Sequence, residues 1–273
     1  MAVRFVNMLK YDFLEMKAIS RFMLWGYAKE CLDNNGLWFS KPGLWADPYE
    51  KLIYESKDGN GKEFPLKGRI LMTCFSSQYS PESLWQRNFI DENSRINIIE
   101  EDRFPVNVRV KTAELLRSLK ELSKSTEIEN IYIGQVTYRK TEDLNRFLKK
   151  ATIVDEEIDS IELLLHKRVP FSHEREIRII VVYKDSNILD DLKNHYICPF
   201  NSNVISCIVT PPRLSSDKEK TGSVNKNAKV KADLEAMGYV KGNSKSICNK
   251  QIEVRHSALF RERSKPIVIK MLC

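Results

Sequence analysis

The sequence predicts an α+β protein, and three observations lead to this fold class. Strand-like and helix-like segments follow one another without the regular βα alternation of a doubly wound sheet. Within residues 176–183, every position from Ile177 to Val182 except Arg178 is apolar and β-branched, which is typical of a buried strand. Residues 112–123 carry leucines at helical spacing, which indicates an amphipathic helix.

The length of the chain favours a single domain. With 273 residues, of which 42% are hydrophobic, the chain can bury a substantial core but is short for two domains. We therefore expect one elaborated domain over residues 1–273. Its core should span about residues 20–210, followed by a basic C-terminal sector at residues 213–273.

The first part of the chain predicts short strands between helices. Residues 5–35 read as helix, strand and helix, and the apolar run at residues 22–27 is the strand. Strands are also expected at residues 37–40, before a Lys-Pro-Gly turn, and at residues 69–75. Residues 80–83 resemble a helix start, because Pro and an acidic residue both suit the first turn of a helix.

The second part of the chain alternates less regularly. Strands are expected at residues 131–138, 176–183, 204–209, 252–254 and 267–269, and helices at residues 155–166 and 225–237. Residues 215–223 are expected to form a loop.

The excess positive charge lies in the basic C-terminal sector. Residues 1–212 contain 30 basic and 31 acidic side chains, whereas residues 213–273 contain 14 basic and 6 acidic ones. Such a sector suggests an anionic partner, among which we consider nucleic acid, an acidic protein and a phosphate-bearing ligand. The alternative is a solvated surface of mobile lysines.

Several classes of protein are disfavoured by what the sequence lacks. It has no apolar stretch long enough to span a membrane, no apolar secretory core and no CxxC spacing among its six cysteines. A soluble cytoplasmic protein with reduced thiols is therefore expected. Phosphate-loop, dinucleotide-binding, zinc-protease and kinase motifs are missing, and the four histidines show no paired spacing, so no metal site is expected.

The sharpest chemical feature is the charged stretch from Glu174 to Arg178. On a strand, Glu174, Glu176 and Arg178 would share one face, where the buried strand emerges. Two neighbouring carboxylates repel each other and raise a pKa, while the arginine lowers it. An ionised carboxylate there could stabilise a cationic transition state or accept a proton. The structural alternative is an ion-pair ladder at the start of a strand.

Three clusters of residues, taken in their order along the chain, resemble the motifs of a large, poorly characterised family of prokaryotic proteins. The first cluster is Phe39-Ser40-x-Pro42 with Ala46-Asp47-Pro48-Tyr49-Glu50, in place of that family's FNDPFE stretch. The second is Cys74-Phe75-Ser76 followed by Leu84-Trp85, and the third is Lys167 with Glu174-x-Glu176-x-Arg178. The sequence departs from the family pattern at Ala46, Leu84, Asn88 and Phe171.

The same layout resembles the ADP-ribosyltransferase superfamily. Those folds have a first strand with Arg or His before Gly, a second strand with Ser, and a late strand with Glu. Here Trp25-Gly26, Ser76 and Glu174-x-Glu176 stand at these positions, and the first lacks the Arg or His. Arg21, four residues earlier, is a poor substitute on strand geometry.

The resemblance implies an α+β fold with an ADP-ribosyltransferase-like mixed sheet, inserted and flanking helices, and NAD as substrate. It implies that Glu176 stabilises the oxocarbenium-like state and that Glu174 orients or deprotonates the acceptor. Further roles follow for residues that would contact NAD or hold Glu176: Trp25, Gly26, Tyr27, Ser76, Trp85, Arg87, Lys167 and Arg178.

The function expected from these features is NAD-dependent mono-ADP-ribosylation by a bacterial toxin or anti-phage defence effector. The basic C-terminal sector favours a nucleic acid as acceptor, with RNA preferred to DNA, and an antitoxin protein is a possible partner. Two alternatives remain open. One is a non-enzymatic nucleic-acid-binding module that uses Lys226, Lys229 and Lys231, and the other is a metal-dependent nuclease that uses Asp47, Glu174 and Glu176.

Overall fold

A computed structural model gives the fold of the chain. It describes residues 3–44, 51, 54–55, 61, 63–78, 84–85, 102–150, 157–190, 195–200, 203–211, 226–239 and 252–256. The expected stretch around Asp47, the side chain of Arg87, the loop at residues 215–223 and the strand at residues 267–269 lie outside these ranges.

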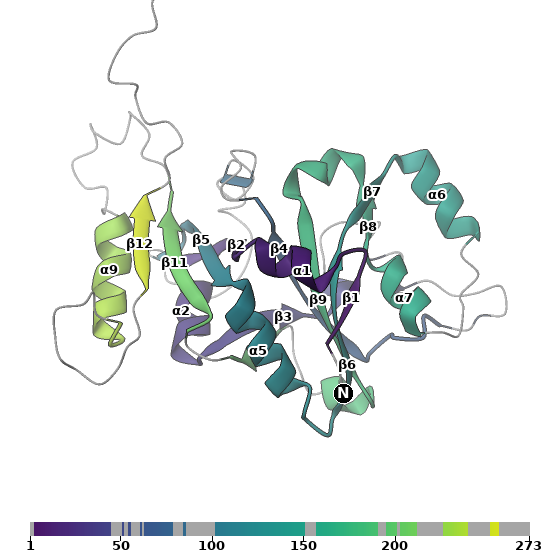
Figure 1. The fold of residues 1–273 in the computed structure, drawn as a ribbon, viewed down its shortest axis with the longest axis horizontal. Coiled ribbons are helices and arrows are strands. Elements are labelled where there is room, and N and C mark those ends of the chain that lie inside the picture. The colour runs from purple at the N-terminus through teal and green to yellow at the C-terminus, as the bar shows by residue number, and fades with distance from the viewer. Residues whose placement is uncertain are drawn as a thin grey trace, which may run out of the picture.

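The expected α+β class with a mixed sheet is confirmed (Figure 1). The helices are α1 (Lys10–Glu15), α2 (Trp25–Asp33), α5 (Thr112–Leu122), α6 (Thr141–Lys150), α7 (Glu157–Leu163), α8 (Asn187–Asp190) and α9 (Lys226–Ala236), with 3-10 turns η1 (Pro42–Leu44) and η4 (Val169–Glu174). The strands are β1 (Val3–Val6), β2 (Ala18–Leu24), β3 (Gly36–Ser40), β4 (Ile70–Ser76), β5 (Pro105–Lys111), β6 (Ile128–Gln135), β7 (Thr137–Arg139), β8 (His166–Arg168), β9 (Glu176–Tyr183), β10 (His195–Pro199), β11 (Ile205–Thr210) and β12 (Glu253–His256).

One large sheet organises the described residues. Its strands run in the order β1-β6-β9-β4-β2-β5-β11-β12, and the β10-β3 pair joins β4 from the side. The pairs β1·β6 and β11·β12 are parallel, whereas those between β6 and β11 in this order are antiparallel. Strand β4 pairs with two different strands along one edge: Ser76 pairs with β2, and Met72 pairs with β3. A separate parallel pair, β7·β8, lies beside this sheet.

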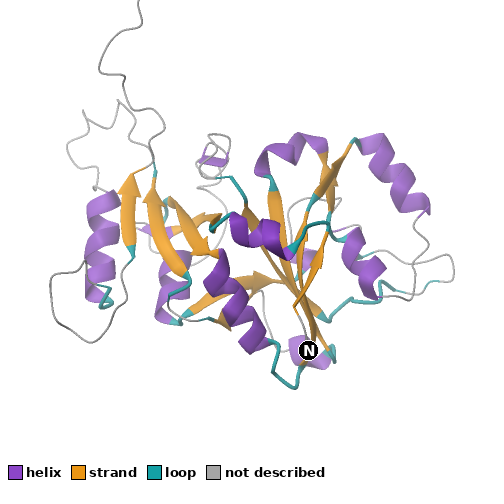
Figure 2. Cartoon of the chain, viewed as in Figure 1, coloured by secondary structure: helices purple, strands orange, loops and turns teal. Residues whose placement is uncertain are grey.

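The two faces of the large sheet have different covers. On one face, α1, α2, α5 and α9 bury the largest hydrophobic cluster, which includes Leu32, Leu116 and Leu234 together with the β-branched side chains of β5 and β9. On the other face, α7 covers the end of the sheet at β6, β9 and β4, and Trp85 covers β2 and β11. Figure 2 shows the strands running through the middle of the molecule with helices along their flanks.

Several expected elements are corrected by the structure. The apolar run at residues 22–27 is a strand only up to Leu24, the last residue of β2, because Trp25 begins α2. The chain turns there because the Trp25 amide donates to the carbonyl of Phe104, a contact 79 positions away that the local pattern cannot indicate. Strands β1, β5, β8 and β10 and helix α6 were not predicted. No helix among the described residues is long and apolar enough to cross a membrane.

Candidate active site

A row of polar side chains crosses the sheet on the face shared by α7 and Trp85. Ser76 on β4 lies directly opposite Glu176 on β9 and opposite Ser20 on β2, and Ser20 in turn lies opposite Arg109 on β5. Directly opposed residues project to the same face of a sheet. All four side chains are buried. The expected neighbours Ser76 and Glu176 are thus brought together, and the register adds Ser20 and Arg109, which the sequence analysis missed.

The loop before β9 shapes the acidic end of this row. Glu174 closes the 3-10 turn η4, and Arg175 adopts a left-handed conformation with a φ of 42° before β9 begins at Glu176. The expectation that Glu174 lies on the strand is therefore wrong. The turn is held from β4, because Ser76 Oγ donates to the carbonyl of Glu174 at 2.6 Å and the Ser77 amide donates to that of Arg175 at 3.0 Å.

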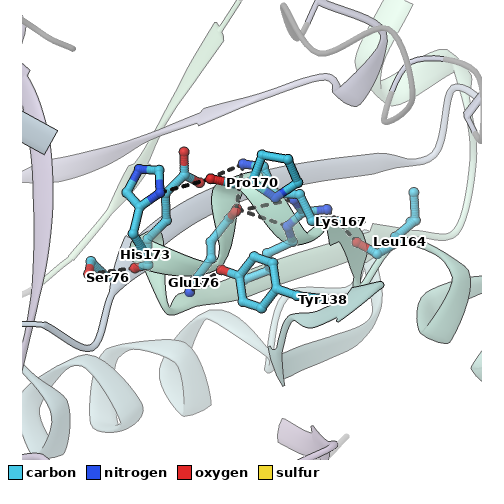
Figure 3. A network of polar contacts seen from close by, with 9 residues as sticks. Ser76, Tyr138, Leu164, Lys167, Pro170, His173 and Glu176 are labelled. Carbon is cyan, nitrogen blue, oxygen red and sulfur yellow. Dashed lines mark hydrogen bonds and ion pairs between the residues drawn. The ribbon is translucent and has the colours of Figure 1, made fainter. Parts of the chain in front are cut away.

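Lys167 links the two glutamates despite the turn between them, and Arg178 adds a second cation at Glu176 (Figure 3). Lys167 Nζ lies 2.6 Å from Glu174 Oε2 and 3.0 Å from Glu176 Oε2. Arg178 Nε lies 2.9 Å from Glu176 Oε1, and another of its nitrogens donates to the carbonyl of Leu164. Lys167 also stands 5.0 Å from the ring centre of Phe171, so an aromatic face shields the ammonium group.

The cations keep Glu176 ionised in a buried position. Burial, the largest influence, opposes ionisation, but the charges of Arg178 and Lys167 outweigh it, helped by hydrogen bonds from Arg178 and Cys74. The pKa of Glu176 falls to about 2. The carboxylate is therefore negative throughout the physiological pH range, as a group that stabilises a developing cation must be.

Tyr138 on β7 is a further residue that touches this site. Its hydroxyl accepts a hydrogen bond from the Glu176 amide at 2.8 Å, which fixes the first residue of β9 (Figure 3). Burial is the main reason that the pKa of Tyr138 rises to about 12, with Glu176 and Glu174 adding to the effect. The hydroxyl thus stays protonated. Nothing in the local sequence marks Tyr138, because its partner lies 38 residues away.

The residues expected to contact NAD from the first motif have packing partners of their own in the structure. Trp25 is fully buried, and its indole nitrogen donates to Asp233 of α9 at 2.8 Å. Gly26 follows it on α2, and Tyr27 packs on Trp38 with ring centres 4.3 Å apart. Among the described residues, Trp25 thus contacts Asp233 and Tyr27 contacts Trp38. Trp25 therefore has a structural partner of its own.

Arg21 cannot replace the missing first-motif cation on the Glu176 face. It stands one position after Ser20 on β2, so its side chain projects from the opposite face. There it donates to the carbonyl of Trp38 and to Thr73 Oγ1. Trp85 does lie over the Glu176 face, but it is fully buried against Phe22, with ring centres 4.8 Å apart.

Comparisons with known proteins give distant similarities only. No protein-family model matches the sequence, and no curated protein matches it. Two solved structures that resemble the fold are Thermus sp. 2.9 DarT in complex with ADP-ribosylated ssDNA, and the same protein in complex with NAD+. The first has 9% identity, a TM-score of 0.37 and coverage of 88% of this chain and 95% of that one. The second has 10% identity, a TM-score of 0.34 and coverage of 88% and 96%. Because both TM-scores are below 0.5, the ADP-ribosylated ssDNA and the NAD+ in those complexes are ligands of DarT and are not assigned to this protein.

Proposed function

We propose that this protein transfers ADP-ribose from NAD to a nucleic acid, with Glu176 as the catalytic carboxylate. The observation that carries the proposal is a buried, ionised Glu176 that lies opposite Ser76 in the sheet and is linked to Glu174 through Lys167. This is the Ser and Glu-x-Glu part of the pattern on which the resemblance to ADP-ribosyltransferases rests.

The chemistry needs a fixed negative charge beside a sugar. When the bond between the ribose C1′ and the nicotinamide nitrogen breaks, its electron pair leaves with nicotinamide and positive charge develops on the ribose. An ionised Glu176 would stabilise that charge, as carboxylates do in glycosidases. The acceptor atom then bonds to C1′ and loses its proton to Glu174, which shares Lys167 with Glu176.

Tyr138, Arg178 and Ser76 act as positioning residues in this scheme. Tyr138 and Ser76 hold the backbone of Glu176 and Glu174, respectively, and Arg178 orients the carboxylate of Glu176. For Trp25, Gly26, Tyr27 and Trp85, the described contacts support packing roles, and the proposal does not depend on them.

The acceptor in this proposal is RNA or single-stranded DNA, reached in the cytoplasm. The basic sector favours a polyanion in general, but part of it has internal partners. Lys229 pairs with Asp102 at 3.1 Å and Lys226 stands 5.8 Å from the ring centre of Phe104, whereas Lys231 is exposed. Among the described residues, nothing selects for or against a ribose 2′-hydroxyl, so both polymers belong in the test. A role as a toxin or defence effector predicts growth arrest when the protein is expressed without a neutralising partner.

The test incubates the purified protein with NAD labelled in the adenine portion and with single-stranded DNA, RNA or lysate. We expect label transfer to a nucleic acid and release of nicotinamide. Glu176→Gln should abolish both, whereas Glu174→Gln should lower transfer more than it lowers hydrolysis of NAD. Glu63→Gln removes a carboxylate from an exposed ion pair with Lys67 and serves as the control. If no acceptor gains label and no nicotinamide appears, the proposal is wrong.

The charge cluster also bears on the nuclease alternative. A divalent metal binds through free carboxylate oxygens, but both oxygens of Glu176 are already in contact with Arg178 or Lys167. Activity that survives EDTA would agree with this reading.

A further inference from the structure

A second site is connected to Glu176 through Tyr138. A cavity of about 560 Å³ lies between β7, α6 and the start of η4. It is lined by Tyr138, Arg139, Lys140, Asp143, Arg146, Phe147 and Val169. Tyr138 joins the two sites, because its ring lines the cavity while its hydroxyl holds the amide of Glu176. A ligand in this cavity would therefore be separated from the catalytic strand by one side chain.

The charge of the cavity suits an anion. Three of its lining side chains are cations and one is a carboxylate. That carboxylate, Asp143, lies 3.5 Å from Arg146. Arg139 and Lys140 form no ion pair with any residue that the structure describes, and Lys140 is exposed. Two positive charges are thus available to a ligand at the β7 end of the cavity.

The aromatic walls add a second requirement for the ligand. The Arg139 guanidinium stands 4.6 Å from the ring centre of Phe147, and His166 packs against the same ring with centres 4.4 Å apart. Phe147 is therefore a rigid support that holds Arg139 in place. Tyr138 and the exposed Val169 give the rest of the lining an apolar character. A ligand that combines a phosphate with a flat apolar group matches such a surface.

We propose that this cavity binds one nucleotide of the acceptor strand, with its phosphate on Arg139 and Lys140 and its base toward Tyr138 and Val169. This inference rests on the proposed function, and it names the place where the acceptor is held. The volume is within the range of nucleotide-sized ligand pockets, and a base that is paired inside a duplex cannot enter a pocket of this kind. The acceptor nucleotide should therefore be unpaired.

Binding of short oligonucleotides without NAD tests the cavity separately from catalysis. Fluorescence anisotropy with labelled single-stranded 12-mers of DNA and RNA would compare the wild type with the double variant Arg139→Ala, Lys140→Ala. We expect the Kd to rise about tenfold or more at low salt. The slope of log Kd against log salt should fall by about 1.4, which corresponds to two lost phosphate contacts on a single strand.

The matched control removes the same two kinds of charge elsewhere. Arg117→Ala with Lys124→Ala deletes two exposed cations on and just after α5, which covers the opposite face of the sheet, and binding should not change. Because Arg139 packs on Phe147, a second variant, Lys140→Glu with Arg146→Glu, alters exposed side chains only and should weaken binding at least as much.

Three outcomes would overturn the inference. Equal losses in the α5 control and the cavity variants would mean that the effect is one of net charge alone. Unchanged binding in both cavity variants would mean that the strand lies elsewhere. If the cavity variants bind oligonucleotides normally but their melting temperature no longer rises with NAD, the cavity is a site for NAD. Failure of ADP-ribosyl transfer itself would leave the oligonucleotide result readable, because that measurement requires no reaction.

Discussion

Among single residues, Lys167 has the largest influence on how the two glutamates share the site. It lies between the carboxylates of Glu174 and Glu176 with only 8% of its side chain exposed. Without a cation there, two negative groups would repel each other in a poorly solvated position. Arg178 contacts Glu176 and the Leu164 carbonyl, so it binds one of the two carboxylates from the other side. Lys167 therefore holds the carboxylates of Glu174 and Glu176, the proposed acceptor-side base and the proposed catalytic group, beside each other.

Replacement of this lysine should destabilise the fold. Lys167→Met keeps most of the volume and removes the charge, which leaves a buried carboxylate without its partner. We expect the free energy of unfolding to fall by about 3 kcal/mol, the usual effect of breaking a buried ion pair. Urea denaturation at neutral pH measures the change. Lys67→Met, which breaks the exposed pair with Glu63, should leave the midpoint unchanged. Similar effects of the two substitutions would show that Lys167 is not a structural bridge.

Some residues of the site could be predicted from the sequence, and others could not. Glu176, Arg178 and Lys167 were found because they lie within twelve positions of each other in an alternating pattern. Tyr138 and Ser20 were not, since their relation to Glu176 arises from strand pairing over long separations. The sequence pattern placed the first motif at Trp25-Gly26. In the sheet, however, the residue of β2 that lies opposite Ser76 is Ser20.

Among the structural elements, the junction between η4 and β9 gives the site its shape. Residue 175 turns the chain by a left-handed conformation, and this brings the carboxylate of Glu174 back toward Glu176. The hydrogen bonds from Ser76 and Ser77 fix that turn from the neighbouring strand β4. Sequence alternation alone gave a continuous strand here, because a single left-handed residue leaves no mark on hydrophobic periodicity.

Substitutions at Arg175 test whether the left-handed turn is required. Arg175→Gly should stabilise the protein by up to about 1 kcal/mol, because glycine adopts this conformation without a steric penalty. Arg175→Val should destabilise it by about 1–2 kcal/mol, because a β-branched side chain is strained there. Thermal unfolding gives both values. Equal melting temperatures for the two variants would contradict a left-handed residue 175.

Elements with strong local patterns were predicted, and those that depend on their neighbours were not. β9 and α5 were found because their composition and periodicity are clear. β5 was missed, since Asn107 and Arg109 interrupt its apolar residues and point toward the polar face of the sheet. The short strands β1 and β8 are stable only through parallel pairing with β6 and β7.

For the molecule as a whole, the basic C-terminal sector is partly built into the core. Helix α9 packs Val230 and Leu234 into the largest hydrophobic cluster, and its Asp233 accepts the hydrogen bond of Trp25. Strand β12 extends the sheet beside β11. Helix α9 and strand β12, the described parts of this sector, are therefore integrated into the fold. The cavity beside Tyr138 also offers positive charge, and Tyr138 connects it to the start of β9.

The stability of the whole protein in acid should report the ionisation of Glu176. Its pKa in the folded state is about 2, below the ordinary value of 4.5, because Arg178 and Lys167 outweigh burial. A carboxyl group with a lowered pKa stabilises the folded state fully above its unfolded pKa. That contribution is lost as the pH falls from about 4.5 through about 2. The wild type should therefore lose its advantage over Glu176→Gln within this window, as measured by urea denaturation at successive pH values. Other carboxyl groups titrate in both proteins and largely cancel in the difference. A difference between the two proteins that stays constant from pH 6 to pH 2 would mean that Glu176 is not held ionised by its cations.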